Sequence, residues 1–342
     1  MTTLPRYSVL VPARDEEAVL AECYRRLRQV MDSTQEPYEI IFIDDGSRDR
    51  TPELLGALSA SDARVKVISF SRNFGHQVAI SAGMDHASGR AVIVLDADLQ
   101  DPPEVIPQMI ARWKEGYEVV YGRRDRRRGE SLAKKATSFL FYRLLRGLTD
   151  VDIPADVGDF RLIDRKVCDV MASIRERNRF VRGIISWVGF RQAAVGYVRE
   201  KRLAGRTKYP PTKMMRFALD AIFGFSYRPL KLASYLGLFT SFAGSLYLAY
   251  VLYLKYFTDR TVQGWTSIIA LNLIFNGIVL LILGIMGEYI GRIYDESKGR
   301  PFYVVRERLG FELAEPPTLA ESRDPAPGVE ASVEAEGSRR LR

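Results

Sequence analysis

Histidine and cysteine are scarce in this chain of 342 residues, and their scarcity excludes several kinds of active site. The two histidines, His76 and His86, are too few for a zinc site built on imidazoles or for an obvious Ser-His triad. His76 is expected to begin a helix and bond locally, with contact to a substrate as the alternative. Cys23 and Cys168 lack metal-ligand spacing, which predicts buried thiols in a reducing compartment.

A cleavable targeting segment is also missing from the expected organisation. Residues 1–5 lead directly into a predicted strand, so no signal peptide is expected. Acidic residues, 42 in number, are outnumbered by 50 Lys and Arg, and the resulting net charge of +8 suits nucleic acid or an anionic membrane. No nucleic acid is expected as a partner, because the Arg-rich stretches adjoin predicted lipid-facing helices without an aromatic stacking platform.

Strand and helix patterns alternate through the first third of the chain. This alternation predicts βαβ units, a parallel sheet and therefore an α/β fold. The expected strands are 7–12, 38–43, 65–70, 91–94 and 118–121, and the expected helices are 18–31, 51–59, 76–87 and 104–115.

Acidic residues follow three of the predicted strands at the point where each strand ends. They occur in the segments 13–17, 44–47 and 96–101. Because ligands bind at the carboxyl ends of parallel strands, these residues are expected to share one rim of the sheet. A rim so acidic suits a metal ion or contacts to ribose and base, and the alternative is a set of solvated helix caps.

Asp96 and Asp98 form the most informative acidic pair. They stand one residue apart directly after the apolar run 91–95. Hard divalent cations such as Mg²⁺ or Mn²⁺ prefer oxygen ligands and often bridge to substrate phosphates, so the pair predicts such a site. Asp-x-Asp is also common in polar turns, which is the competing interpretation.

Two long apolar segments predict a transmembrane hairpin. Residues 232–257 carry Lys255 as their only charge, and the second span is placed at 266–290, uncharged as far as residue 287. Each is long enough to cross a hydrocarbon core of about 30 Å. Basic residues such as Lys231 and Arg292 flank the pair, whereas the connecting loop carries little positive charge. The positive-inside rule then places both termini in the cytoplasm and the protein in the plasma membrane as a multi-pass chain.

Other segments suggest membrane contact or self-association. Residues 131–146 and 213–227 pair a basic face with an apolar one, which predicts interfacial helices, with ordinary packed helices as the alternative. Asn272 and Asn276 lie one turn apart in the second span, which favours a homo-oligomer or, equally, a bond to the first span.

The expected organisation is a catalytic domain at 1–210, an interfacial helix at 211–230, the hairpin at 231–291 and a cytoplasmic segment at 292–342, disordered from about 315.

Four motifs in this order resemble the family 2 glycosyltransferases. They occupy residues 11–17, 44–47, 71–76 and 96–103. Within that family, the paired C-terminal spans are similar to the polyprenyl-phosphate branch, which contains dolichol-phosphate mannose synthases and bactoprenol glucosyltransferases. The resemblance extends from about Arg6 to Glu307. It implies a GT-A fold, a nucleotide-binding α/β sandwich.

The resemblance also implies roles for the motif residues. A nucleotide-sugar donor, with UDP favoured, would lie along the rim with Mg²⁺ or Mn²⁺ neutralising its diphosphate. The nucleotide pocket would be lined by Pro12, Ala13, Asp15 and Glu17, with Asp45 near base or ribose, Asp96 at ribose and metal, Asp98 as the main metal ligand and Gln100 facing the sugar.

The implied acceptor is polyprenyl (undecaprenyl) phosphate. Its second pKa is about 6, so it is already a largely anionic nucleophile at neutral pH. By resemblance Asp159 lies near the reacting centre, as base or as an orienter, and a turn residue capping the backbone is the alternative. Basic residues suited to holding the phosphate are Arg124, Arg202 and Lys208.

The expected activity is an inverting transfer that yields a polyprenyl-phosphate sugar on the cytoplasmic face. Two other functions compete with it. A transferase with a non-lipid acceptor is disfavoured by a basic cradle so close to the bilayer. An inactive, membrane-tethered nucleotide-sugar binding protein would be expected to lack Asp98 or Asp159, and both are present.

Overall fold

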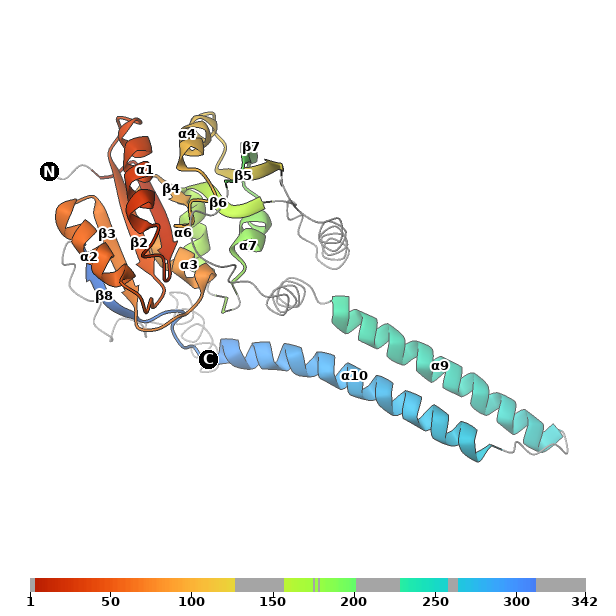
Figure 1. Cartoon of the computed structure of the whole chain (residues 1–342). Coiled ribbons are helices and arrows are strands. Elements are labelled where there is room, and N and C mark those ends of the chain that lie inside the picture. The colour runs from red at the N-terminus through yellow and green to blue at the C-terminus, as the bar shows by residue number, and fades with distance from the viewer. Residues whose placement is uncertain are drawn as a thin grey trace, which may run out of the picture. The chain divides into compact units, whose positions relative to one another are not determined.

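The computed structural model describes residues 4–126, 157–174, 176–177, 179–200, 228–257 and 264–311. The interfacial helices expected at 131–146 and 213–227 lie outside these residues, as does the tail expected from 315. In the part described, the chain forms one mixed eight-stranded sheet, helices on both of its faces, and a pair of long C-terminal helices (Figure 1).

The sheet has the strand order β7-β5-β6-β4-β1-β2-β3-β8. Its centre, β4-β1-β2-β3, is parallel, whereas β6 pairs antiparallel with both β4 and β5, and β8 pairs antiparallel with β3. The strands are β1 Tyr7–Ala13, β2 Tyr38–Asp44, β3 Val65–Phe70, β4 Ala91–Val94, β5 Val119–Arg126, β6 Val157–Asp164, β7 Gln192–Val198 and β8 Val305–Leu309.

The prediction of a parallel sheet is therefore correct for the four central strands and wrong for the sheet as a whole. The central strands read as apolar runs because both of their faces are buried; every residue of β1 and β2 is buried. Strand β6 lies antiparallel between β4 and β5, and a hydrophobic run carries no information on the direction of a strand. Neither β7 nor β8 was predicted.

Helices cover the two faces of the sheet. On one face, α1 (Leu20–Asp32), α2 (Thr51–Ser61) and α4 (Ile106–Lys114, after a 3-10 turn at Pro103–Val105) pack into one core with the inward residues of β1 and β2. The opposite face carries α3 (His76–His86), α6 (Arg165–Ser173) and α7 (Val181–Trp187). All four predicted helices exist, with ends shifted by a few residues.

The two cysteines are free and buried, as expected. Cys23 lies in α1 and Cys168 in α6. Burial raises the pKa of each thiol to about 12, so both remain protonated at neutral pH. They contribute apolar volume to the two faces of the sheet.

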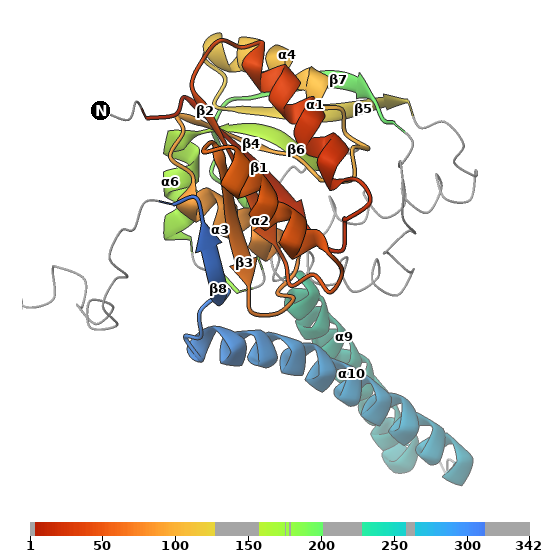
Figure 2. The same cartoon turned by 60° about the vertical axis from the view of Figure 1, so that its left-hand side comes forward.

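The long C-terminal helices, α9 (Arg228–Phe257) and α10 (Trp265–Ser297), run side by side (Figures 1 and 2). Gly237 of α9 faces Ile282 of α10, and a Cβ added at Gly237 would lie 3.9 Å from the Ile282 side chain, an ordinary van der Waals distance. Their segments Arg228–Leu254 and Ile274–Ser297 are long and apolar enough to cross a membrane. The pair fits the expected hairpin.

After α10 the chain returns to the sheet. Strand β8 pairs with β3 along its outer edge, with Val67 opposite Leu309 and Ile68 opposite Arg308 (Figure 2). Just before β8, Tyr303 stacks on Phe70 with ring centroids 5.2 Å apart. The sheet is thus completed by residues that follow the hairpin in sequence.

Candidate active site

The carboxyl ends of β1 and β2 bring two acidic loops together. Asp15 accepts a hydrogen bond from the Arg48 amide at 2.8 Å, and its own amide donates to Ser47 Oγ at 3.0 Å. Glu17 accepts from the Arg50 amide at 3.0 Å. These reciprocal bonds fix the loop that follows Pro12 and Ala13 against the loop that follows β2.

Asp45 organises a third loop on the same rim. Its side chain is buried and accepts hydrogen bonds from the amides of Phe74 at 2.7 Å and Gly75 at 3.1 Å, and from the side chain of Asn73. Gly46 adopts φ 68°, and a Cβ there would lie 2.6 Å from the backbone of the same loop, so a glycine is required. Burial raises the pKa of Asp45 and outweighs the two amide bonds, which act to lower it.

His76 joins the ends of β4 and β6 at the centre of the site. It begins α3, as predicted, but its Nε2 lies 3.4 Å from Asp96 Oδ1 and 3.3 Å from Asp159 Oδ2. The expectation of a merely local bond for His76 is therefore wrong. Its position follows from the loop that Asp45 holds, because that loop directs the first turn of α3 toward both carboxylates.

Asp159 is the most heavily bonded carboxylate of the site. Arg182 donates from Nε to Oδ1 at 2.8 Å and from Nη2 to Oδ2 at 3.1 Å. Gln77 Nε2 donates to Oδ2 at 3.2 Å. Asp159 is 8% exposed, so these contacts replace water around the charge.

The three central groups have shifted protonation equilibria. Burial raises the pKa of Asp96 to about 6, against the lowering effect of His76. Burial alone would lower the pKa of His76, but Asp96 and Asp159 raise it to about 9. Although burial acts in the opposite direction, Arg182 and His76 hold the pKa of Asp159 well below its usual range. His76 is therefore cationic and Asp159 anionic at neutral pH.

The Asp96–Asp98 loop fits a divalent cation only when a substrate completes the ligand set. Asp96 Oδ1 is buried and accepts no hydrogen bond from the described residues, and Asp98 Oδ1 accepts the Gln100 amide at 3.1 Å. Leu99, which lies between Asp98 and Gln100, adopts φ 55°. Among the described residues no group of three or more His, Cys, Asp or Glu side chains could hold a metal by itself. Two carboxylates plus diphosphate oxygens are a donor set suited to Mg²⁺ or Mn²⁺.

A second cluster lies beside this loop. Asp101, 1% exposed, bonds the Tyr197 hydroxyl, and its Oδ2 lies 3.5 Å from Arg124 Nη2. Arg124 also donates from Nε to the Tyr197 hydroxyl at 3.2 Å. The amide oxygen of Gln100 accepts from Arg199 at 2.6 Å. Of the predicted basic residues, Arg202 and Lys208 lie outside the described part of the chain.

The structure thus brings Asp96, Asp98 and Asp159 together, and it adds three residues that sequence reasoning missed or underrated. His76 is the last residue of the motif segment 71–76, which was the available signal. Gln77 and Arg182 had no motif, because their relation to Asp159 arises only when α3, β6 and α7 pack together.

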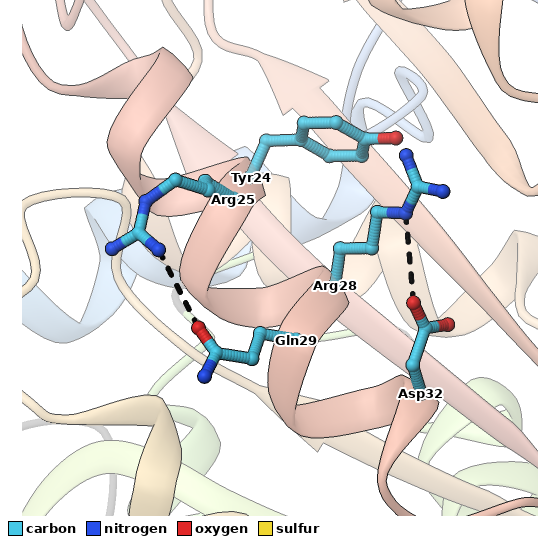
Figure 3. Close-up of a pocket in the computed structure, with 5 residues that line it drawn as sticks. All are labelled: Tyr24, Arg25, Arg28, Gln29 and Asp32. Carbon is cyan, nitrogen blue, oxygen red and sulfur yellow. Dashed lines mark hydrogen bonds and ion pairs between the residues drawn. The ribbon is translucent and has the colours of Figure 1, made fainter.

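A shallow pocket on the outer surface of α1 has no such chemistry. Its lining residues are Tyr24, Arg25, Arg28, Gln29 and Asp32 (Figure 3). Arg28 pairs with Asp32 at 3.5 Å and Arg25 donates to Gln29 at 3.4 Å, so its charged groups are paired within the helix. The active-site candidate is the rim, not this pocket.

Comparison with known proteins agrees with this geometry. Residues 8–171 match Glycosyl transferase family 2, and residues 228–293 match the GtrB C-terminal hairpin. The chain is 60% identical to an uncharacterized glycosyltransferase, YkcC, of Bacillus subtilis over 90% of this chain and 95% of that protein. It is 40% identical to the bactoprenol glucosyl transferase of Shigella phage SfV over 88% of this chain and 98% of that protein. The prophage bactoprenol glucosyl transferase homolog of Escherichia coli is 39% identical over 88% of this chain and 98% of that protein.

These matches include both the sheet with its acidic rim and the apolar helix pair. The mixed sheet and its covering helices are the GT-A fold that the motifs implied. The chain belongs to glycosyl transferase family 2 and carries a C-terminal hairpin of the GtrB type.

Proposed function

We propose that this glycosyltransferase moves a sugar, with inversion, from a UDP-sugar to polyprenyl phosphate at the cytoplasmic face of the plasma membrane. The observation that carries the proposal is the meeting of Asp96 and Asp159 at His76, on the rim of a sheet whose chain continues into an apolar hairpin. Relatives at about 40% identity, matched over almost their full length, are named bactoprenol glucosyl transferases.

The nucleotide is proposed to bind over the β1 and β2 loops. Pro12 and Ala13 would face the base, with Asp15 and Glu17 fixing the loop through bonds to Arg48 and Arg50. Asp45 would act at base or ribose through the 73–75 loop, whose amides it holds. Gln100 would lie toward the sugar from the Asp96–Asp98 loop, which Arg199 braces.

Asp98 is proposed as the main ligand of Mg²⁺ or Mn²⁺, with Asp96 beside it. When bound, the ion would neutralise the charge that develops on the departing nucleoside diphosphate. The protein's own contribution is to hold the Asp96 carboxylate at the rim, where its Oδ1 accepts no hydrogen bond from the described residues and faces His76 Nε2 at 3.4 Å.

The acceptor phosphate is proposed to bind at Arg124, Arg202 and Lys208. Arg124 is oriented by Asp101 and Tyr197, which leaves its guanidinium in a fixed position. A phosphate monoester whose second pKa is about 6 reacts as an anion at neutral pH without losing a proton to the enzyme. Asp159 would complete the reacting centre.

The cytoplasmic location is supported by the connectivity of the hairpin. Strand β7 precedes α9 and β8 follows α10, and both strands belong to one sheet. Both ends of the hairpin therefore start from the same domain. Basic residues at those ends, such as Lys231 and Arg300, favour the cytoplasmic side.

Purified protein in lipid nanodiscs, supplied with undecaprenyl phosphate, Mg²⁺ and a panel of nucleotide sugars, tests the proposal. The expected product is a lipid of increased mass that corresponds to one added hexose or aminosugar, together with free nucleoside diphosphate. Nucleotide release without a lipid product would indicate another acceptor. Binding of nucleotide without any release would indicate a protein that does not catalyse transfer.

A further inference from the structure

Donors of the protein surround the Asp159 carboxylate. A carboxylate offers about four acceptor positions, two on each oxygen. Oδ2 is approached by three donors, Arg182 Nη2 at 3.1 Å, Gln77 Nε2 at 3.2 Å and His76 Nε2 at 3.3 Å, so its positions are filled. Oδ1 accepts from Arg182 Nε at 2.8 Å. All of these donors come from the protein.

The donors are themselves held in one orientation. Gln77 Oε1 accepts the Val181 amide at 3.1 Å, and this bond fixes which end of the Gln77 amide faces Asp159. Arg182 donates from Nη1 to the Val157 carbonyl at 3.0 Å while its other nitrogens hold Asp159. The carboxylate therefore cannot turn without breaking bonds to α3 and α7.

We propose that Gln77 and Arg182 are positioning residues that clamp Asp159 as a fixed anion, whose role is to orient His76 toward Asp96 and not to accept a proton. This inference rests on the proposed function, because it assigns the role of Asp159 in that transfer. It agrees with the chemistry of the acceptor, since an anionic phosphate brings no proton that must be removed. The low pKa of Asp159 is consistent with this role.

Substitution of Gln77 distinguishes an Asp159 that anchors His76 from an Asp159 that acts as a general base, because the two roles predict opposite changes in kcat. Gln77→Met keeps the side-chain length and removes one donor from Asp159. If Asp159 is a clamped anchor, kcat falls about tenfold or more, the usual effect of losing a hydrogen bond to a charged group. If Asp159 is a general base, the change frees an acceptor position and makes it more basic, so kcat holds or rises.

Arg182→Lys provides a second, independent variant. Lysine keeps the positive charge but cannot form the two parallel bonds that arginine makes. Because both residues act through Asp159, the double variant is expected to lose less kcat than the product of the two single losses. If the loss of kcat in the double variant equals the product of the two single losses, Gln77 and Arg182 act independently and the proposal that they clamp Asp159 together is wrong.

Ser81→Ala is the matched control. Ser81 is buried in the same helix and donates to the Gln77 backbone carbonyl at 2.9 Å without touching Asp159. It is expected to lower the melting temperature slightly and leave kcat unchanged. The dissociation constant of UDP, measured by calorimetry, should stay within about twofold for Gln77→Met, whereas general structural damage would weaken it together with kcat.

Failure of the proposed function can be told apart from failure of the clamp. If the wild-type protein transfers no sugar to undecaprenyl phosphate, the proposed function is wrong. Melting temperatures of the wild type, the two single variants and the double variant then test the clamp by themselves. Non-additive losses support it, and additive losses overturn it.

Discussion

At the scale of single residues, the site depends on charges placed where water is largely excluded. His76 Nε2 lies 3.4 Å from Asp96 and 3.3 Å from Asp159, and Asp98 follows Asp96 by two residues in the same loop. Such groups are costly to bury singly and stabilise one another when paired. Each therefore has a measurable effect on stability as well as on catalysis.

Asp98→Ala is expected to reduce metal-dependent transfer at least a hundredfold. The substitution removes a hard oxygen ligand from the loop in which Asp98 Oδ1 accepts the Gln100 amide. Turnover at several Mg²⁺ and Mn²⁺ concentrations, together with a melting curve, checks this. Asp169→Ala, on the exposed surface of α6, is the control. Near-normal turnover of Asp98→Ala would refute the metal assignment.

His76 is expected to make stability depend on pH. Its pKa in the folded protein is about 9, above the value of about 6.5 in an unfolded chain, so the folded state binds the proton more tightly. The resulting stabilisation is fully present below pH 6.5 and is lost as pH rises through 9. Its size is on the order of 1–3 kcal/mol, reduced by solvent because the side chain is 30% exposed.

Melting temperatures of the wild type and His76→Gln, measured without metal from pH 6 to pH 10, test this dependence. The wild type is expected to melt higher at pH 6, and the difference is expected to shrink toward pH 10. A difference that grows with pH would mean that His76 is held neutral in the folded protein.

The residues that the sequence could identify were those adjoining strand ends. Asp96 and Asp98 could be predicted because they follow an apolar run and parallel strands end at one rim. Asp159, near the start of the antiparallel strand β6, was identified only through the family resemblance. Gln77 and Arg182 could not be predicted, because their contacts with Asp159 depend on side-chain packing between separate elements. Local patterns carry no information on such contacts.

At the scale of elements, β8 is the least expected part of the fold. It shields the edge of β3, and Val304 accepts a hydrogen bond from the Ser71 amide at 2.9 Å just before it. Tyr303 donates to Asp85 at 3.1 Å in addition to stacking on Phe70. These contacts join β8 to the segment that leads into the Asp45-bound loop.

Truncation after residue 299 is expected to destabilise the catalytic domain. It removes β8 and Tyr303, exposes the edge of β3 and uncovers Phe70. The expected loss is about 2–4 kcal/mol, or roughly 5–15 °C in melting temperature. Thermal unfolding and UDP calorimetry on the truncated and full chains measure it. Truncation after Phe311 is the control, and equal stability of both truncated proteins would show that β8 is dispensable.

The sequence could not predict β8 for a physical reason. Its segment, Val-Arg-Glu-Arg-Leu, has only two apolar residues, because an edge strand buries little and carries charge on its open side. The central strands were predictable because burial on both faces demands apolar residues at every position.

At the scale of the whole molecule, the chain leaves the sheet after β7 and re-enters it at β8. The hairpin is therefore an insertion between two strands of one sheet, not a terminal anchor. Its membrane-spanning character could be predicted from length and composition alone, whereas its position inside the catalytic domain could not. The reason is that pairing between β3 and β8 spans most of the chain.

Replacement of residues 229–297 by a short flexible linker separates membrane delivery from the fold. Because β8 is retained, the variant is expected to bind UDP within about threefold of the wild type. Transfer to undecaprenyl phosphate is expected to fall at least tenfold, since the long chain contributes binding through the bilayer. Transfer to a water-soluble short-chain prenyl phosphate is expected to fall much less.

Rates with both acceptors, measured for the wild type and the replacement variant, check this prediction. An equal loss with the long and the short acceptor would mean that the hairpin supports the reacting centre itself. The interpretation of the hairpin as a lipid-delivery element would then be wrong.

The placement of β8 also sets an order of events during synthesis. The ribosome completes β1 to β7 before it makes the hairpin, and it makes β8 only afterwards. Until then the edge of β3 is open and the stacking of Tyr303 on Phe70 is absent. The nascent domain therefore completes its sheet only after the apolar helices have left the ribosome and become available for insertion. On the proposed function, the edge of the sheet is thus completed only once the hairpin that meets the lipid acceptor has been made.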